Sequence, residues 1–212
     1  MPKKAYSEQE VEALRIKIMD EASRIMALEG IANISMRRLS AQLGMTAPNL
    51  YNYFPSKHDL FLKTSLRGFE LLSRDMEAVT EGIKDPRERL RAILKASFVF
   101  AKNHLGYWEL IFHPPISMRE LEGTPFIEVV QVLRQKTFDL MMKSVYAVSD
   151  AYTDETGSLP IRAITAMTNV HGLIDLYNHR LLAQLGDEVE QMVEHLIDAS
   201  LNLIFPLQAR VS

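Results

Sequence analysis

The chain has 212 residues, 47% of them hydrophobic and 24% charged, which predicts a folded protein with a substantial core and excludes intrinsic disorder. The absence of cysteine excludes disulfides and thiolate metal sites, and no apolar run reaches the ~20 residues of a membrane span, so we expect a cytoplasmic protein. The net charge is −3, but the charges are unevenly distributed along the chain. Residues 1–68 carry ten Lys and Arg against seven Asp and Glu, whereas the remainder carries fourteen against twenty. This asymmetry is either chance or the basic end of a nucleic-acid binder.

Capping signals and the helical spacing of apolar residues predict four helices in the first third of the chain. Ser7 to Glu10 form a capping box for the first helix, and Gly30 ends it. Pro55 stops the third helix, and Ser56 caps the fourth. These helices are expected at about residues 8–29, 36–43, 46–54 and 57–81.

The same signals continue through the rest of the chain. Asp85 and Pro86 open a fifth helix, and a loop is expected from His113 to Gly123 after a short aromatic helix. The further helices are expected at about residues 86–103, 106–112, 124–152, 158–185 and 187–205. The pattern predicts an all-α fold of about nine helices, without strands or internal repeats.

The second and third predicted helices have the spacing of a helix-turn-helix. Ser40 is small enough for two helices to cross closely, and Gly44 supplies the left-handed backbone of the turn between them. Apolar residues occur where they would face Ile34 and the first helix, at Leu39, Leu43, Met45 and Leu50. Two short helices joined at a glycine also occur in all-α proteins generally, so a purely structural role is the alternative at this point.

The third predicted helix carries many polar and aromatic side chains. If Leu50 and Phe54 face the core, helical geometry turns the other residues outward. Asparagine amides can hydrogen-bond base edges, while tyrosine hydroxyls and lysines suit phosphate oxygens. The outward residues are Thr46, Ala47, Pro48, Tyr51 and Asn52. The alternative is that Tyr51 and Tyr53 cover a hydrophobic core, a role expected above all for Tyr53.

The segment Ser35–Phe61 (SMRRLSAQLGMTAPNLYNYFPSKHDLF) resembles the DNA-binding segment of TetR-type transcriptional regulators. The shared pattern is a hydroxyl residue opening the second helix, a glycine at the turn, and Leu-Tyr-x-Tyr-Phe-x-Ser-Lys before the fourth helix. The resemblance implies an N-terminal helix-turn-helix DNA-binding domain at residues 1–56. It also implies a C-terminal helical domain at residues 57–212 for ligand sensing and dimerisation.

The resemblance further implies roles for individual side chains. Phosphate contacts are expected from Ser35, Arg37, Thr46, Tyr51, Tyr53 and Lys57. The positions that face the bases are Ala47, Pro48, Asn49 and Asn52. Arg38 stands where the family commonly has an acidic residue, which adds a further expected phosphate contact. The family often has Lys-Gly-Thr in place of the Ala-Pro-Asn tip of this chain, so the resemblance implies no particular operator sequence.

Candidate effector contacts lie in the C-terminal part of the chain. The segment Met167–Tyr177 (MTNVHGLIDLY) resembles a His-Gly element of one C-terminal subclass of the family, although the tryptophan typical of that element is missing. Within it, Gly172 is expected to permit a close helix approach, and a structural core role is the alternative for His171. The candidate effector contacts are Trp108, Phe112, His113, Met141, His171 and Asp175. The histidines are too scattered for metal-ligand spacing, so we expect neither a metal nor a cofactor.

The last two predicted helices, at about 158–185 and 187–205, carry more apolar residues than one buried face needs. These residues are Leu173, Ile174, Leu176, Leu181, Leu182, Met192, Val193, Leu196, Ile197, Leu201 and Ile204. Two such helices from each of two copies would form a four-helix interface, so we expect a homodimer. A dimer presents two recognition helices and would read a roughly palindromic site.

Together these features predict a sequence-specific DNA-binding transcriptional regulator. Repression is the commoner mode in the family, with a small-molecule effector releasing the protein from its operator. The alternative from another class is an all-α ligand-binding protein or enzyme without a DNA role. Against an enzyme, no nucleophile–base pair stands out, and His171 with Asp175 one helical turn away is at most a weak dyad. A third possibility is a regulator that responds to a protein partner instead of a ligand.

Overall fold

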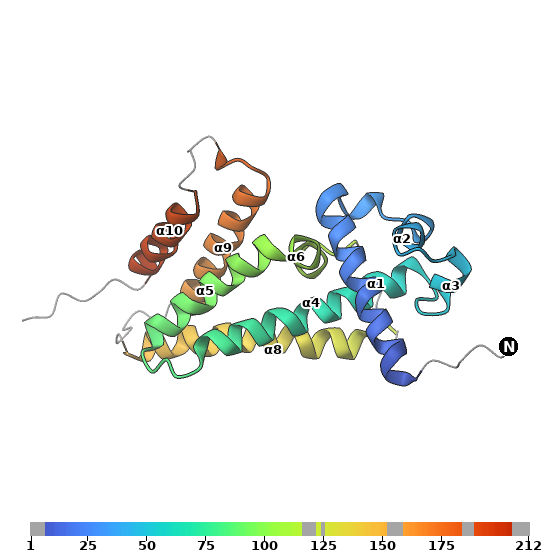
Figure 1. Ribbon diagram of the computed structural model, residues 1–212. Helices are drawn as coiled ribbons and strands as arrows, with labels where there is room; N and C mark the ends of the chain where they lie inside the picture. Colours follow the sequence, from blue (N-terminus) through green and yellow to red (C-terminus); the bar gives the residue numbers. More distant parts are fainter. Residues whose placement is uncertain (1–6, 116–121, 124–125, 152–158, 184–188, 205–212) are drawn as a thin grey trace, which may run out of the picture. The chain divides into compact units, whose positions relative to one another are not determined.

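A computed structural model describes residues 7–115, 122–123, 126–151, 159–183 and 189–204. Within these residues the secondary structure is entirely helical, which confirms the all-α prediction. The elements are α1 (Glu8–Glu29), the 3-10 helix η1 (Ile31–Asn33), α2 (Met36–Gln42), α3 (Ala47–Tyr51), α4 (Lys57–Thr80), α5 (Pro86–Asn103), α6 (Leu105–Phe112), α8 (Phe126–Ala151), α9 (Leu159–Asn178) and α10 (Val189–Ile204) (Figure 1). None of these helices is both long enough and apolar enough to cross a bilayer.

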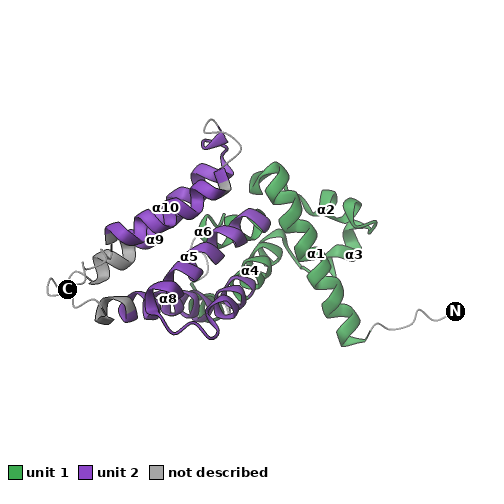
Figure 2. Ribbon diagram, turned by 60° about the vertical axis from the view of Figure 1, so that its left-hand side comes forward, with its two compact units in different colours: residues 1–70, 104–131 green, residues 71–103, 132–212 purple. Residues whose placement is uncertain are grey.

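The chain divides into two compact units (Figure 2). Unit 1 comprises residues 1–70 and 104–131, and unit 2 comprises residues 71–103 and 132–212. Helices α4 and α8 therefore each contribute residues to both units. The boundary predicted between residues 56 and 57 is a division by function, and it stays a prediction.

Helix α1 supplies the centre of the core in unit 1. Its N-terminus has the predicted capping box, in which the Ser7 hydroxyl accepts from the Glu10 amide at 3.2 Å and the Ser7 amide donates to the Glu10 carboxylate at 2.8 Å. Gly30 ends the helix with a φ of +85°. The core residues of this cluster, at 0–2% exposure, are Ile18, Ala22, Ile25, Met26, Ile34, Leu39, Leu50, Phe54, Leu60 and Leu110.

Helix α6 is docked closely on α1 within unit 1. A Cβ atom placed on Gly106 would lie 2.0 Å from the carbonyl oxygen of Ser23, so only glycine allows this approach. The buried Tyr107 hydroxyl donates to the Asp20 carboxylate at 2.5 Å, and the Arg67 guanidinium donates to the same carboxylate oxygen at 3.1 Å. Burial and the neighbouring carboxylate raise the pKa of Tyr107, which therefore stays protonated as a donor. This network joins α1, α4 and α6.

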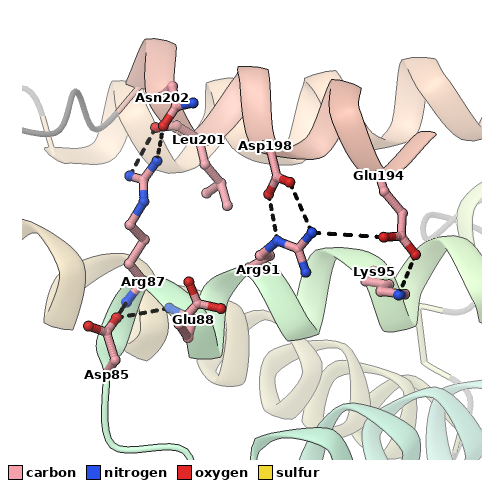
Figure 3. Close-up of polar contacts among 9 residues, drawn as sticks. All are labelled: Asp85, Arg87, Glu88, Arg91, Lys95, Glu194, Asp198, Leu201 and Asn202. Carbon is pink, nitrogen blue, oxygen red and sulfur yellow. Dashed lines mark hydrogen bonds and ion pairs between the residues drawn. The ribbon is translucent and has the colours of Figure 1, made fainter. Parts of the chain in front are cut away.

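In unit 2, α5, α9 and α10 pack together around an apolar core. Polar contacts along one edge join α5 to α10 (Figure 3). The Arg91 guanidinium donates to both oxygens of Asp198, at 2.5 and 2.9 Å, and the Lys95 ammonium lies 2.5 Å from the Glu194 carboxylate. One turn earlier on α5, Arg87 donates to the side chain of Asn202. The hydrogen bond from Arg91 lowers the pKa of Asp198.

Two predicted helix ends differ from the structure. The third helix ends at Tyr51, because i→i−3 hydrogen bonds from the Asn52 and Tyr53 amides tighten its last turn before Pro55. Helix α9 ends at Asn178 instead of residue 185, because the backbone reverses at Arg180, which adopts a φ of +57°. The amides of residues 180 and 181 then close the helix on the carbonyls of residues 177 and 176.

Several sequence predictions concern other parts of the C-terminal region. No described neighbour within the same chain lies within 4 Å of a Cβ atom built on Gly172, so the expected close helix approach is not found among these residues. Residues 113–115 are non-helical as expected. The rest of that loop up to residue 121 lies outside the described residues, as do the gaps expected between the last three predicted helices, at about residues 153–157 and 186.

Candidate nucleic-acid interface

The turn between α2 and α3 has the predicted helix-turn-helix geometry. Gly44 has a φ of +65°, and the amide of Met45 donates to the Ser40 carbonyl at 2.8 Å, which closes the end of α2. Ser40 is buried, and its hydroxyl donates to the Arg37 carbonyl at 2.9 Å. The small side chain therefore satisfies its own polar group where the two helices meet.

Helix α3 is anchored by two residues. Leu50 and Phe54 are both 0% exposed, as the sequence predicts. Thr46 caps the helix, since its hydroxyl accepts from the Asn49 amide at 3.4 Å. Pro48 lies in the first turn, where a missing amide costs no helical hydrogen bond.

The outer surface of α3 is polar and open. Pro48, Asn49 and Asn52 are exposed, and the amide nitrogen of Asn52 lies 3.5 Å from the side-chain oxygen of Asn49. Both amides therefore keep most of their hydrogen-bonding capacity for an external partner. Ala47 is half-buried at the start of the helix.

The two tyrosines of this segment have different environments. Tyr51 is 47% exposed, whereas Tyr53 is partly buried against the core cluster of unit 1. Tyr53 thus has the packing role that the alternative interpretation assigns to it. A DNA contact from either hydroxyl stays a prediction.

The three cations predicted to contact phosphates have different surroundings. Arg37 is exposed, and its guanidinium has no side-chain partner among the described residues. Arg38 forms a two-pronged ion pair with Glu29, at 2.5 Å for each nitrogen–oxygen contact. Lys57, the first residue of α4, lies over the ring of Phe61 at 5.1 Å from its centroid.

Hydroxyl caps fix the starts of α2 and α4 around these cations. The Ser35 hydroxyl accepts from the Arg38 amide at 3.2 Å, so this side chain is engaged in capping. The Ser56 hydroxyl accepts from the Asp59 amide at 2.9 Å and orders the first turn of α4 around Lys57. The sequence predicted the cap at Ser56, whereas Ser35 was expected to contact a phosphate, and that contact stays a prediction.

The six candidate effector contacts fall into two groups. Trp108 is buried in unit 1 with its ring centroid 4.1 Å from that of Phe112, and the imidazole of His113 lies 3.3 Å from the Glu109 carboxylate. Unit 2 contains the other three. Met141 is buried, and His171 and Asp175 lie one helical turn apart on α9. Their roles in effector binding stay predictions.

Two features of unit 1 were not predicted from the sequence. One is the Glu29–Arg38 ion pair, for which the only signal is opposite charge on either side of a glycine turn. The other is an open groove of about 330 Å³ beside α1, lined by Ala13, Ile16, Lys17, Asp20, Glu21, Arg24 and Leu43. None of the candidate effector contacts lines this groove. Among the described residues, no three His, Asp or Glu side chains cluster in a way that could hold a metal ion.

Comparison with protein families agrees with this geometry. Residues 18–64 match the family described as "Bacterial regulatory proteins, tetR family". Residues 90–200, more than half of the chain, match the family described as "Tetracyclin repressor-like, C-terminal domain". The chain belongs to the TetR family. The resemblance seen in the helix-turn-helix segment is thereby confirmed.

Individual TetR-family relatives match over part of their length. The HTH-type transcriptional regulator BetI of Agrobacterium fabrum is 35% identical over 89 residues, which cover 42% of this chain and 43% of BetI. The HTH-type transcriptional activator FasR of Mycolicibacterium smegmatis is 29% identical over 98 residues, which cover 46% of this chain and 45% of FasR. The chain thus spans about half the length of the curated relatives it matches.

Solved structures extend the likeness over nearly the whole chain. The TetR family transcriptional regulator PfmR from Thermus thermophilus superimposes with a TM-score of 0.69 at 18% identity, over 92% of this chain and 100% of PfmR. AibR, solved in complex with isovaleryl coenzyme A and operator DNA, superimposes with a TM-score of 0.66 at 16% identity, over 91% of this chain and 98% of AibR. At these identities the likeness concerns the fold.

Proposed function

We propose that this TetR-family protein is a DNA-binding transcriptional regulator, a repressor that a small-molecule effector releases from a palindromic operator. The observation that supports this function best is the construction of α3. Leu50 of this helix and Phe54 just after its end are completely buried. Asn49, Tyr51 and Asn52 of the same segment are exposed. A helix of five residues with this division of roles is suited to reading base edges in a major groove.

In this proposal the base contacts come from the tip and outer face of α3. Asn49 and Asn52 would hydrogen-bond base edges, and Ala47 with Pro48 would touch thymine methyl groups. The tip lacks a cation, so specificity would depend mainly on the two amides. Phosphate contacts would come from Tyr51 and from cations at the starts of α2 and α4, which position the protein without reading sequence.

The homodimer in this proposal forms through α9 and α10. Several of their apolar residues, including Val193, Ile197 and Leu201, are already buried inside unit 2. Leu176, Leu196 and Leu203 remain exposed, the last at 79%. Exposed leucines on two adjacent helices form a surface that a second copy could cover in a two-fold contact.

Effector control would act through a difference in affinity between two arrangements of the dimer. Because α4 contributes residues to both units, a ligand that favours another orientation of α4 would change the separation of the two recognition helices. Such a ligand must bind one arrangement more tightly than the other to release the DNA. AibR was solved with an acyl coenzyme A and operator DNA, which makes acyl coenzyme A esters a reasonable first class to test here.

A footprinting experiment tests the proposal. The protein is added to the DNA that flanks its own gene, and we expect protection of a roughly palindromic site. Addition of isovaleryl coenzyme A, with free coenzyme A as the control, asks whether an acyl ester abolishes protection. The absence of any protected site would refute the regulator proposal, whereas protection that isovaleryl coenzyme A leaves unchanged would refute only this ester as the effector.

A further inference from the structure

Two neighbouring arginines of α2 differ in their side-chain contacts, although both are exposed. The Arg37 guanidinium has no side-chain partner among the described residues. In contrast, Arg38 is held by Glu29 through both terminal nitrogens, with Nη1 at 2.5 Å from Oε2 and Nη2 at 2.5 Å from Oε1. A two-pronged pair of this kind fixes the plane of the guanidinium as well as its position.

The backbone around this ion pair is fixed on both sides. Glu29 is the last residue of α1, and its carbonyl accepts from the Asn33 side chain at 2.5 Å. Arg38 lies in the first turn of α2, where its amide donates to the Ser35 hydroxyl. The pair thus joins the end of one helix to the start of the next, across the turn at Gly30.

The ion pair is accessible to solvent, with 45% of the Arg38 side chain and 28% of the Glu29 side chain exposed. An exposed pair contributes little to stability, so its removal should leave the fold intact. Its effect on charge is larger. Glu29 neutralises a cation on α2, the helix that packs against α3. It also occupies both terminal nitrogens of Arg38, which would otherwise be available to a phosphate.

We propose that Glu29 is a positioning residue that holds Arg38 away from the DNA phosphates and so limits the affinity of the protein for DNA. Arg37 then acts as the phosphate-binding cation of α2. This inference rests on the proposed DNA-binding function and deepens it, since it assigns different roles to two adjacent arginines. It also identifies a residue of α1 that modulates DNA binding without contacting DNA.

The magnitude follows from counterion release. Each phosphate contact adds about 0.9 to the slope of log K against log salt concentration. Release of Arg38 in Glu29→Gln would add one contact per chain and two per dimer, so the slope should steepen by about 1.8. Between about 50 and 200 mM salt, the variant would therefore lose about 12-fold more affinity than the wild type does.

The experiment is a double-mutant cycle measured on two duplexes of about 30 base pairs. One duplex comes from the DNA flanking the protein's own gene and the other has a random sequence. Wild type, Glu29→Gln, Arg38→Ala and the double variant are titrated at several salt concentrations. We expect Glu29→Gln to bind more tightly at low salt with a steeper slope, and Arg38→Ala to keep the wild-type slope. The double variant should have the slope of Arg38→Ala.

A matched control is available on α1. Arg24 donates to both oxygens of Glu21, at 2.9 and 2.6 Å, so Glu21→Gln removes the same charge from a similar pair. We expect this variant to leave the slope unchanged. Glu29→Ala should reproduce Glu29→Gln, which guards against an effect of the glutamine side chain. Thermal unfolding of every variant checks that the fold is retained.

The outcomes separate the two proposals. A lower slope for Arg38→Ala would mean that Arg38 already contacts phosphate, which overturns the inference. An equal gain from Glu29→Gln in the presence and absence of Arg38 would mean simple relief of repulsion, which overturns it as well. Failure of the wild-type protein to bind either duplex would instead overturn the proposed function.

Discussion

Replacement of Gly106 by alanine tests the docking of α6 on α1. The new Cβ atom would lie 2.0 Å from the Ser23 carbonyl oxygen and 2.7 Å from its carbonyl carbon. Carbon–oxygen contacts in proteins are about 3.3 Å or longer, so the helices would have to separate by about 1.3 Å. Both neighbouring atoms belong to the backbone, which cannot move aside as a side chain can.

The cost has two parts. Overpacking of this kind costs about 1–3 kcal/mol. Separation of the helices would also weaken the hydrogen bond from Tyr107 to the Asp20 carboxylate, a charge-assisted contact of about 1.5–3 kcal/mol. We therefore expect a destabilisation of about 3 kcal/mol or more, equivalent to a fall in melting temperature of about 6–12 °C for a chain of this length.

The assay uses the single tryptophan of the chain, Trp108, which is buried in unit 1 and reports on its unfolding. Two other glycines serve as controls. Gly172→Ala meets no described neighbour within 4 Å and should gain up to about 1 kcal/mol from helix propensity. For Gly68→Ala the three nearest atoms belong to the side chains of Ile111 and Tyr107, at 3.0–3.2 Å, so this change should cost less than the change at residue 106. A Gly106→Ala variant that melts with the wild type would refute the docking.

Three further predictions concern DNA binding, pH and assembly. Lys57→Ala should reduce the slope of log K against log salt concentration by about 0.9 per chain on any duplex. Asn52→Ala should relax the sequence preference in a competition assay, and an equal loss of affinity on all sequences would argue against base reading by Asn52. Arg91 lowers the pKa of Asp198 in the folded protein. The ionised Asp198 therefore contributes to stability above the unfolded-state pKa of about 3.9, and this contribution is lost as the pH falls below that value. The difference in unfolding free energy between wild type and Asp198→Asn should shrink from neutral pH to about pH 3, and a constant difference would contradict the ion pair. Leu203→Glu should shift the protein from dimer to monomer in light scattering, because it places a charge in the proposed interface, and an unchanged mass would place the interface elsewhere.

The sequence predicted helix starts better than helix ends. The starts of α1, α2 and α5 are set by side chains that bond the nearest amides, at Ser7, Ser35 and Asp85, and such local contacts can be read from spacing alone. The end of α9 could not be read in this way. Arg180 adopts a left-handed backbone conformation, which is uncommon in residues other than glycine, so no local residue marked the end of the helix.

The candidate site shows the same division between local and distant information. Helical periodicity predicted that Leu50 and Phe54 are buried. Tyr51 is exposed, as the expected DNA contact requires, and Tyr53 is partly buried, as the packing alternative requires. The pairing of Arg38 with Glu29 depends on how α2 is placed against the end of α1, which no periodicity encodes. An effector pocket is formed by side chains from segments far apart in the sequence. The candidate effector contacts could therefore be chosen only by residue type.

The anchoring of α3 by two buried residues bears on how such a protein can evolve. Its exposed side chains contribute little to the core, whereas Leu50 and Phe54 hold the helix in place. The exposed residues are Pro48, Asn49, Tyr51 and Asn52. Substitutions on the outer face should therefore be nearly neutral for folding. Recognition of a new DNA sequence could then be acquired by mutation one surface position at a time, in a lineage whose scaffold remains unchanged.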